Sequence, residues 1–291
     1  MQSIRVLLEQ IIDYAGLFPP AQLNMAEAAM NYARYRTVPD SWMLGRFIVP
    51  ATRLEEFGDA AEPFLRDGGP WRLSALCGLP LSRDLQRIEA FRRRGLAAEV
   101  ETLEIKPSRP EEIGPAMEEL PEKVTAYFEV PLAAEPSNFI RYISDTGARA
   151  KMRTGGITPE SIPGSQQVAR FILSCAESGV PFKATAGLHH PLHGLHRLTS
   201  HDDSPRTPMH GFLNVFLASA FAKAGAGLEE MIDLLNEESL DEFTFEDGCI
   251  RWRTNEFSSE LLAETRQTFA IAFGSCSFDE PVEDLKTLSL L

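Results

Sequence analysis

Six apolar runs alternate with segments of helical periodicity along the first two thirds of the chain. The runs start 24 to 33 residues apart, at 46–50, 71–78, 98–105, 124–130, 148–155 and 181–187. The segments between them space their apolar positions as amphipathic helices do, and several open on a capping residue or an early proline. Repeated strand and helix units of this length indicate parallel strands that are joined by right-handed crossovers.

The repeating unit predicts an α/β protein with a (β/α)8 TIM barrel. A further apolar element at 11–20 precedes the six runs. No Gly-x-Gly-x-x-Gly follows the first strand, which argues against a dinucleotide-binding sheet. The run 212–222 is either the eighth strand or a buried helix, because periodicity does not distinguish the two.

We predict one domain, in which the barrel core spans about residues 10–225. A C-terminal helical and hairpin addition at about 226–291 follows the core. Its expected elements are a helix, a hairpin with an Asp-Gly turn and a last helix, at 229–236, 243–252 and 258–270.

Composition excludes several classes of partner. The 291-residue chain is 44% apolar and 24% charged, as is typical of globular proteins. Its formal charge of −14 argues against a nucleic-acid partner and an anionic membrane surface. No apolar run is long enough to span a membrane, and no signal-peptide pattern opens the chain. The four cysteines are scattered without Cys-x-x-Cys spacing, which indicates reduced thiols in a cytoplasmic protein.

Lysine is scarce, with 6 residues against 22 arginines, yet two lysines stand inside predicted strands. Lys151 opens the motif Lys-Met-Arg-Thr-Gly-Gly, and Lys183 opens Lys-Ala-Thr-Ala-Gly. Lysine is seldom buried unless it has a partner or a chemical role. Because the sixth and seventh strands of a barrel are neighbours, we expect the two ammonium groups to lie close together near the active face.

Two ammonium groups in a dry pocket disfavour each other's charge, so that one pKa falls and the amine becomes nucleophilic near neutral pH. Such an amine attacks a carbonyl group and forms an iminium, which is an electron sink for making or breaking a C–C bond. Glu101, on the fourth strand, is the candidate carboxylate that moves protons or holds the second lysine. The alternative is that both lysines are structural and form salt bridges with Glu101 and Glu129.

Several motifs resemble, in the same order, those of the deoxyribose-phosphate aldolase family of class I aldolases. The Lys151 motif and Thr158-Pro-Glu-Ser are similar to the family's Lys-Thr-Ser-Thr-Gly and Thr-x-Glu-Asp. The Lys183 motif is similar to its Lys-Ala-Ser-Gly-Gly. Ile12-Asp-Tyr-Ala-Gly-Leu-Phe-Pro resembles its Ile-Asp-His-Thr-Leu-Leu-x-Pro, and Ala98-Glu-Val-Glu resembles its Ala-Asp-Glu-Val-Asp. The matches cover about residues 10–187.

The resemblance implies roles for five residues. Lys151 would form the Schiff base, and Lys183 would tune it. Glu101 would shuttle protons, and Asp13 would line the site. Glu129 stands where the family carries Ile-Glu-Thr, which makes it a candidate substrate contact.

Arg153 departs from the family, which has a small hydroxyl residue at this position. Its guanidinium would grip an anionic group by two parallel bonds, and the alternative is a bridge to a glutamate of the fourth or fifth strand. Thr154 follows it as a further candidate substrate contact. Past Gly187 the family's phosphate-gripping loops are not visible, so either the chemistry is kept with a different substrate or the chemistry is lost.

All six histidines lie in a loop at 189–210, which also contains Asp202 and Asp203. His189 and His190 directly follow the seventh strand, and we expect them to bind substrate or to act as acid–base groups. Alternatively, His189, His190 and His193 hold a divalent metal such as Zn, although no His-Glu-x-x-His occurs. The last interpretation is an ordinary polar loop.

These patterns predict a lyase of class I aldolase type that acts on a small anionic aldehyde or ketone and needs no cofactor. A metal-dependent hydrolase or lyase that uses the histidine loop is the second hypothesis. A barrel that binds an anionic metabolite without catalysis is the third. We expect a small-molecule substrate, with no nucleic-acid or membrane partner, and the 18 phenylalanines leave room for a homo-oligomer contact.

Overall fold

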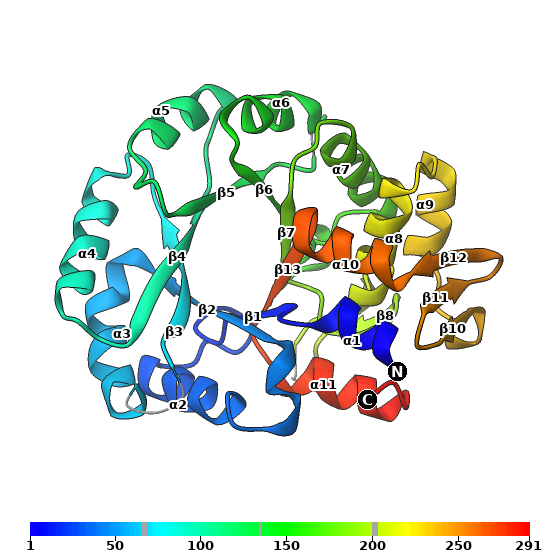
Figure 1. Ribbon diagram of the computed structural model, residues 1–291, viewed down its shortest axis with the longest axis horizontal. Helices are drawn as coiled ribbons and strands as arrows, with labels where there is room; N and C mark the ends of the chain where they lie inside the picture. The colour runs from blue at the N-terminus through cyan, green and yellow to red at the C-terminus, as the bar shows by residue number, and fades with distance from the viewer. Residues whose placement is uncertain (66–68, 134, 200–202) are drawn as a thin grey trace.

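Eight parallel strands close into a barrel, which confirms the predicted (β/α)8 fold (Figure 1). The computed structural model describes residues 1–65, 69–133, 135–199 and 203–291. The barrel order is β1-β13-β7-β6-β5-β4-β3-β2. The strands are β1 (Ile12–Tyr14), β2 (Leu44–Pro50), β3 (Trp71–Cys77), β4 (Ala98–Ile105), β5 (Thr125–Val130), β6 (Arg149–Arg153), β7 (Phe182–Thr185) and β13 (Ala270–Ser275).

Helices form a ring around the barrel (Figure 1). They bury their apolar faces on the outer surface of the strands, where aromatic side chains such as Phe57 and Phe171 are fully buried. At the start of α2, Asn24 Oδ1 accepts a hydrogen bond from Glu27 N at 2.9 Å, as expected for an N-cap. The helices between barrel strands include α2 (Met25–Tyr35), α3 (Leu54–Ala61), α4 (Ser82–Arg93), α5 (Ile113–Glu118), α6 (Ser137–Thr146), α7 (Ser165–Glu177), α8 (Phe212–Lys223) and α10 (Ser259–Thr268).

The eighth barrel strand is not the run at 212–222. That run is helix α8, and all its residues except Lys223 are buried. It packs against α7, α9 (Leu228–Leu235), α10 and β13, so it is covered on every side and shows no amphipathic period. The barrel closes instead through β13, which pairs with β1 and β7. The expected core boundary near residue 225 was therefore wrong, because the core continues to Ser275.

The remaining elements decorate the barrel. The predicted hairpin is confirmed as β10 (Phe243–Phe245) and β11 (Cys249–Trp252), and β12 (Asn255–Ser258) extends it to three strands. A second hairpin, β8 (Gly194–Arg197) and β9 (Arg206–Met209), lies within the histidine loop. Helices α1 (Gln2–Leu8) and α11 (Asp279–Thr287) lie near the chain termini (Figure 1). No helix in the described ranges is long and apolar enough to cross a bilayer.

Candidate active site

Lys151 and Lys183 are direct neighbours in the register of β6 and β7. Both ammonium groups contact one carboxylate, Glu104 of β4. Lys151 Nζ lies 2.9 Å from Glu104 Oε2, and Lys183 Nζ lies 2.7 Å from Glu104 Oε1. The expected meeting of the two strand lysines is therefore present, with a shared carboxylate between them.

Each lysine has a second acidic partner of its own. Lys183 Nζ lies 2.5 Å from Asp13 Oδ2 on β1, and Lys151 Nζ lies 3.1 Å from Glu129 Oε2 on β5. Asp13 is oriented by the backbone of Arg46, whose N–H donates to Oδ1 at 2.7 Å. The three carboxylates and two amines thus form a charge network built from five strands of the barrel.

The network keeps its central groups charged. Burial would raise the pKa of Glu104, but the charges of Lys183 and Lys151 and their hydrogen bonds outweigh it and hold that pKa well below its ordinary value. Burial would lower the pKa of Lys183, but the charges and hydrogen bonds of Asp13 and Glu104 raise it instead. Ser74 Oγ also donates to Glu104 Oε1, at 2.8 Å, which orients the carboxylate further.

The two lysines differ in their access to space. A cavity of about 120 Å³, which we name the inner cavity, opens at the C-terminal ends of the strands, and Lys151 and Glu104 line it. Lys183 is not among its lining residues, and its side chain is only 1% exposed. The ammonium of Lys183 lies deeper, 5.6 Å from the centre of the Tyr127 ring. Of the two amines, only that of Lys151 faces open space in the described part of the chain.

The glycines that end the two lysine motifs allow β6 and β7 to approach closely above the site. A Cβ on Gly155 would lie 2.7 Å from the Cα of Gly187, and Gly187 has a φ of +76°. Thr154 completes this junction, because its hydroxyl donates to the carbonyl of Ala186 at 2.5 Å. Thr154 is buried and does not line the inner cavity, so its role as a substrate contact stays a prediction.

Arg153 lies at the rim, where it lines both the inner cavity and a neighbouring surface pocket. Its side chain is exposed. Within the described ranges it forms no ion pair or hydrogen bond, so the alternative of a bridge to a strand glutamate is not what the structure has. Glu129, the other candidate contact at this end, lines the neighbouring pocket and is paired with Lys151 and Lys106.

Glu101 is not part of the lysine network, which corrects the expected proton shuttle. Its carboxylate pairs instead with Arg46 at 2.9 Å and with Arg72 at 2.9 Å, below the lysines. A register shift between β3 and β4 leaves Glu101 without a partner residue in β3. The carboxylate that meets the lysines is Glu104, three residues further along the same strand.

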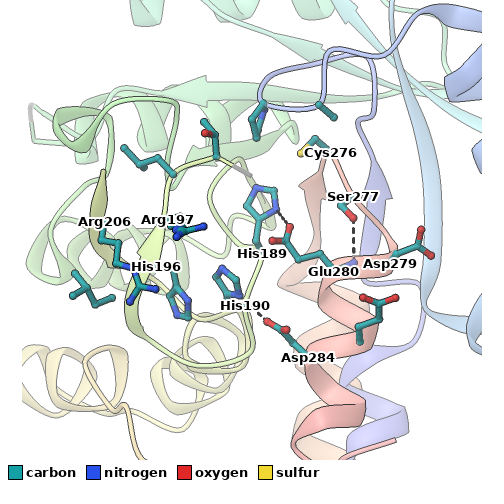
Figure 2. A pocket seen from close by; sticks show the side chains of 16 residues that line it. His189, His190, His196, Arg197, Arg206, Cys276, Ser277, Asp279, Glu280 and Asp284 are labelled. Atoms are coloured by element: carbon teal, nitrogen blue, oxygen red, sulfur yellow. Dashed lines mark hydrogen bonds and ion pairs between the residues drawn. The ribbon is translucent and has the colours of Figure 1, made fainter. Parts of the chain in front are cut away.

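Three of the histidines, His189, His190 and His196, line a second and larger cavity of about 650 Å³, which we name the outer cavity (Figure 2). His189 Nδ1 lies 2.8 Å from Glu280 Oε2, and His190 Nδ1 lies 2.6 Å from Asp284 Oδ2; both acids belong to α11. The two cavities adjoin, because they share four lining residues: Pro20, His189, Leu198 and Cys276. His189 is thus the only histidine of the described chain that lines both.

The predicted metal set of His189, His190 and His193 does not converge. Each ring pairs with a different carboxylate, and that of His193 lies 3.3 Å from Glu238. No group of three or more side chains placed to hold a metal occurs at residues 1–65, 69–133, 135–199 and 203–291. His201 and Asp202 of the same loop lie outside these ranges.

The sequence predicted the lysines and histidines of the site better than the carboxylates that pair with them. Glu104 stands two residues before Lys106 on a recognised strand, but its inward direction depends on the irregular register. Glu280 and Asp284 lie in the tail after residue 273, whose mixed pattern gives no element. Their spacing of four residues on a charged helix is the one signal that could have placed both acids on one face.

Comparison with protein-family models and with curated proteins found no match. In a TIM barrel the active site lies at the C-terminal ends of the strands, where the inner cavity and its lysine also lie. Such barrels support many chemistries, so the reaction must be argued from the residues themselves.

Proposed function

We propose that this protein is a lyase of class I aldolase type, in which Lys151 forms an iminium with a small anionic aldehyde or ketone. The observation that carries the proposal is the asymmetry of the lysine pair. Lys151 reaches the inner cavity, whereas Lys183 is sealed behind it by Glu104 and Asp13. A buried lysine beside a cavity and a second, fixed cation is the arrangement expected of a reactive amine.

In the proposed first step, the Lys151 amine in its unprotonated form adds to the substrate carbonyl carbon. The carbonyl oxygen then receives one proton from the adding nitrogen and one from solvent and leaves as water, and the product is an iminium cation on Nζ. This cation replaces the ammonium of the resting state. Glu104 and Glu129, which contact Nζ at 2.9 and 3.1 Å, would therefore stabilise the iminium by the same charge interaction.

Lys183 has the role of a fixed charge in this scheme. Its two carboxylate partners keep it protonated, as the raised pKa indicates. It holds one oxygen of Glu104, so that Glu104 is shared between two cations and is not a counter-ion of Lys151 alone. Removal of this charge would alter the reactive amine without touching the substrate.

The position of Arg153 supports the proposal that the substrate is anionic. Its guanidinium has no partner in the described part of the chain and lies at the rim of the cavity that contains Lys151. A free guanidinium can bind a carboxylate or phosphate by two parallel charge-assisted bonds. The substrate would then bind with its carbonyl towards Lys151 and its anionic group towards Arg153.

The resemblance of the lysine motifs to the deoxyribose-phosphate aldolase family supports the same covalent chemistry. The site departs from the family's pattern in its acid–base groups, because the carboxylate that contacts the lysines is Glu104 and not Glu101. The histidine loop also stands where the family carries its phosphate-binding loops. The covalent chemistry is therefore proposed without the family's substrate.

Borohydride trapping tests the proposal. The protein is incubated with pyruvate, glyoxylate or glyceraldehyde 3-phosphate, then reduced and measured by intact mass spectrometry. We expect a single adduct in the wild type and none in Lys151→Ala. An absence of adduct with all three compounds, or an equal adduct in Lys151→Ala, would contradict the proposal and leave the anion-binding barrel as the better account.

A further inference from the structure

We propose that His189, held by Glu280, is the acid–base residue that moves protons at the substrate bound to Lys151. This inference rests on the proposed iminium chemistry and extends it to the step that Glu101 was expected to perform. It is carried by the position of one His–carboxylate pair at the junction of the two cavities. The sequence neither predicts this pair nor includes Glu280 in any expected element.

The inner cavity contains few groups that could exchange a proton. Its titratable lining residues, among those that the structure describes, are Glu104, Lys151, Arg153, His189 and Cys276. Lys151 is consumed by the iminium, and arginine stays charged at all relevant pH values. The pKa of Glu104 is held well below its ordinary range, so near neutral pH Glu104 is a weak base and has no proton to donate. Burial raises the pKa of the Cys276 thiol to about 11.

His189 is the remaining candidate, and its pairing prepares it for this role. Imidazole is the side chain whose ordinary chemistry exchanges protons near neutral pH. Burial would raise the pKa of Glu280, but the hydrogen bond and charge of His189, together with the charges of His190 and His196, lower it, so Glu280 is a carboxylate. A carboxylate only accepts, so the proton of the neutral imidazole lies on Nδ1, and Nε2 is free to act as a base.

The surroundings keep this orientation. Glu280 lies in the first turn of α11, where its backbone N–H donates to Ser277 Oγ at 3.1 Å. Figure 2 shows the second ring nitrogen of His189 turned away from Glu280. Glu280 lines only the outer cavity, whereas His189 lines both. The carboxylate therefore holds the ring from the outer side and leaves the other edge for a substrate.

The proton balance of the proposed step is simple. In the iminium, a C–H bond next to the former carbonyl carbon breaks, and the proton passes to Nε2 of His189. The electron pair forms the C=C bond of an enamine, and the iminium nitrogen becomes neutral. When the enamine carbon attacks an acceptor aldehyde, the imidazolium returns its proton to the new alkoxide oxygen. Glu280 stabilises the imidazolium between the two transfers.

The neighbouring residue provides a matched control. His190 is paired with Asp284 of the same helix, with Nδ1 and Oδ2 2.6 Å apart. Its ring stacks on His196 with the ring centres 3.6 Å apart, and it lines only the outer cavity. The two pairs have the same chemistry and differ in access to the cavity of Lys151. A structural or general electrostatic role would predict similar effects for both.

The experiment uses pyruvate and follows the exchange of its methyl hydrogens for deuterium by NMR in the wild type, His189→Gln and His190→Gln. Each protein is also trapped with borohydride. We expect His189→Gln to keep the Lys151 adduct but to lose exchange by about 100-fold or more, and His190→Gln to lose much less exchange than His189→Gln. Unchanged exchange in His189→Gln, or an equal loss in both variants, would overturn the role of His189. A wild type without an adduct would instead overturn the iminium chemistry.

Glu280→Gln provides a second test that remains usable if His189→Gln does not fold. Glu280 is a positioning residue, so its loss should reduce exchange and move the midpoint of the rate–pH curve to lower pH, because the imidazolium loses its stabilising charge. The other charged or titratable residues that line the two cavities are Glu104, Lys151, Arg153, His190, His196, Arg197, Arg206, Cys276, Asp279, Glu283 and Asp284. They are unchanged in the variant. An unmoved midpoint would contradict the assignment.

Discussion

Two glutamates on the same strand, Glu101 and Glu104, each neutralise two cations inside the barrel. Glu101 pairs with Arg46 and Arg72, whereas Glu104 pairs with Lys151 and Lys183. The cations around Glu101, which we name the lower group, are guanidinium groups, which are always charged and are fixed by their fork of donors. The cations around Glu104, which we name the upper group, are ammonium groups, which can lose a proton and become nucleophiles. The strand therefore contains one charged group built from arginine and one built from lysine, and their glutamates stand three residues apart.

The two groups also differ in access to space. Glu104 lines the inner cavity together with Lys151, whereas Glu101 does not line it. The arginines of the lower group are both occupied by Glu101. At the upper end Arg153 has no partner in the described ranges and lies beside the cavity. The lower group therefore places no side chain beside the inner cavity, whereas the upper group places Lys151 there, next to Arg153.

Replacement of Glu104 should give the largest effect on stability. Glu104→Gln leaves two buried ammonium groups with one carboxylate fewer, and breaking such a buried pair costs about 3–5 kcal/mol. Urea unfolding followed by circular dichroism measures the change. A loss below about 1 kcal/mol would mean that the upper group is not the tightly coupled network described here.

Replacement of Arg153 should affect ligand binding and not folding. Loss of a charged hydrogen bond to the substrate costs about 1.5–3 kcal/mol, which is roughly 10- to 100-fold in binding. We expect Arg153→Gln to trap pyruvate at correspondingly higher concentrations and acetone as the wild type does, because acetone lacks the carboxylate. Equal losses for the two ketones would show that Arg153 acts on the protein and not on the anion. The unfolding midpoint should stay unchanged.

The charges of the upper group should also make the free energy of unfolding depend on pH, with a smaller effect than the two replacements above. The pKa of Glu104 is lowered by folding, so its contribution is present above the unfolded carboxyl value of about 4.3 and is lost as the pH falls below it. The pKa of Lys183 is raised, so its contribution is present below about 10.4 and is lost as the pH rises through the folded value. The free energy of unfolding should therefore decrease as the pH falls below about 4.3 and as it rises above about 10.4. The acid decline should be shallower in Glu104→Gln, and an unchanged slope would contradict the assignment.

Replacement of Glu101 should give the smallest effect. Its side chain is 30% exposed, and pairs that water reaches contribute about 1 kcal/mol or less. We expect Glu101→Gln to lower the free energy of unfolding within that limit and to leave trapping of Lys151 intact. A loss of Lys151 trapping in Glu101→Gln would reinstate Glu101 as a site residue and remove the contrast between the two groups.

The pattern of apolar runs predicted the barrel, but it did not identify elements whose apolar and polar positions show no regular period. Runs at 46–187 alternate clearly because each strand is followed by an amphipathic helix. Helix α8 is covered on all sides, so its eleven buried residues give no helical stripe. Strand β13 is six residues long and contains Gly274 and Ser275, so it gives no strong apolar run. The eighth strand was therefore sought at 212–222 instead of at Ala270–Ser275.

The lysine pair could be predicted, but its partners could not. Lys151 and Lys183 each stand near the start of a strand motif, and parallel register brings them together. The choice between Glu101 and Glu104 depends on the register shift in β4, since residues three apart on a regular strand face opposite sides. Glu280 comes from a helix 97 positions beyond Lys183 in the sequence, and only the closure of the barrel brings it to His189.

Peptide mapping of the trapped protein tests most directly the claim that one lysine of the pair is reactive and the other is a fixed charge. The wild type is reduced with borohydride in the presence of pyruvate, digested and analysed by mass spectrometry, with the exposed Lys123 as an internal reference for unspecific modification. We expect the adduct on Lys151, with Lys183 and Lys123 unmodified. An adduct on Lys183, or modification spread evenly over Lys151 and Lys123, would contradict it.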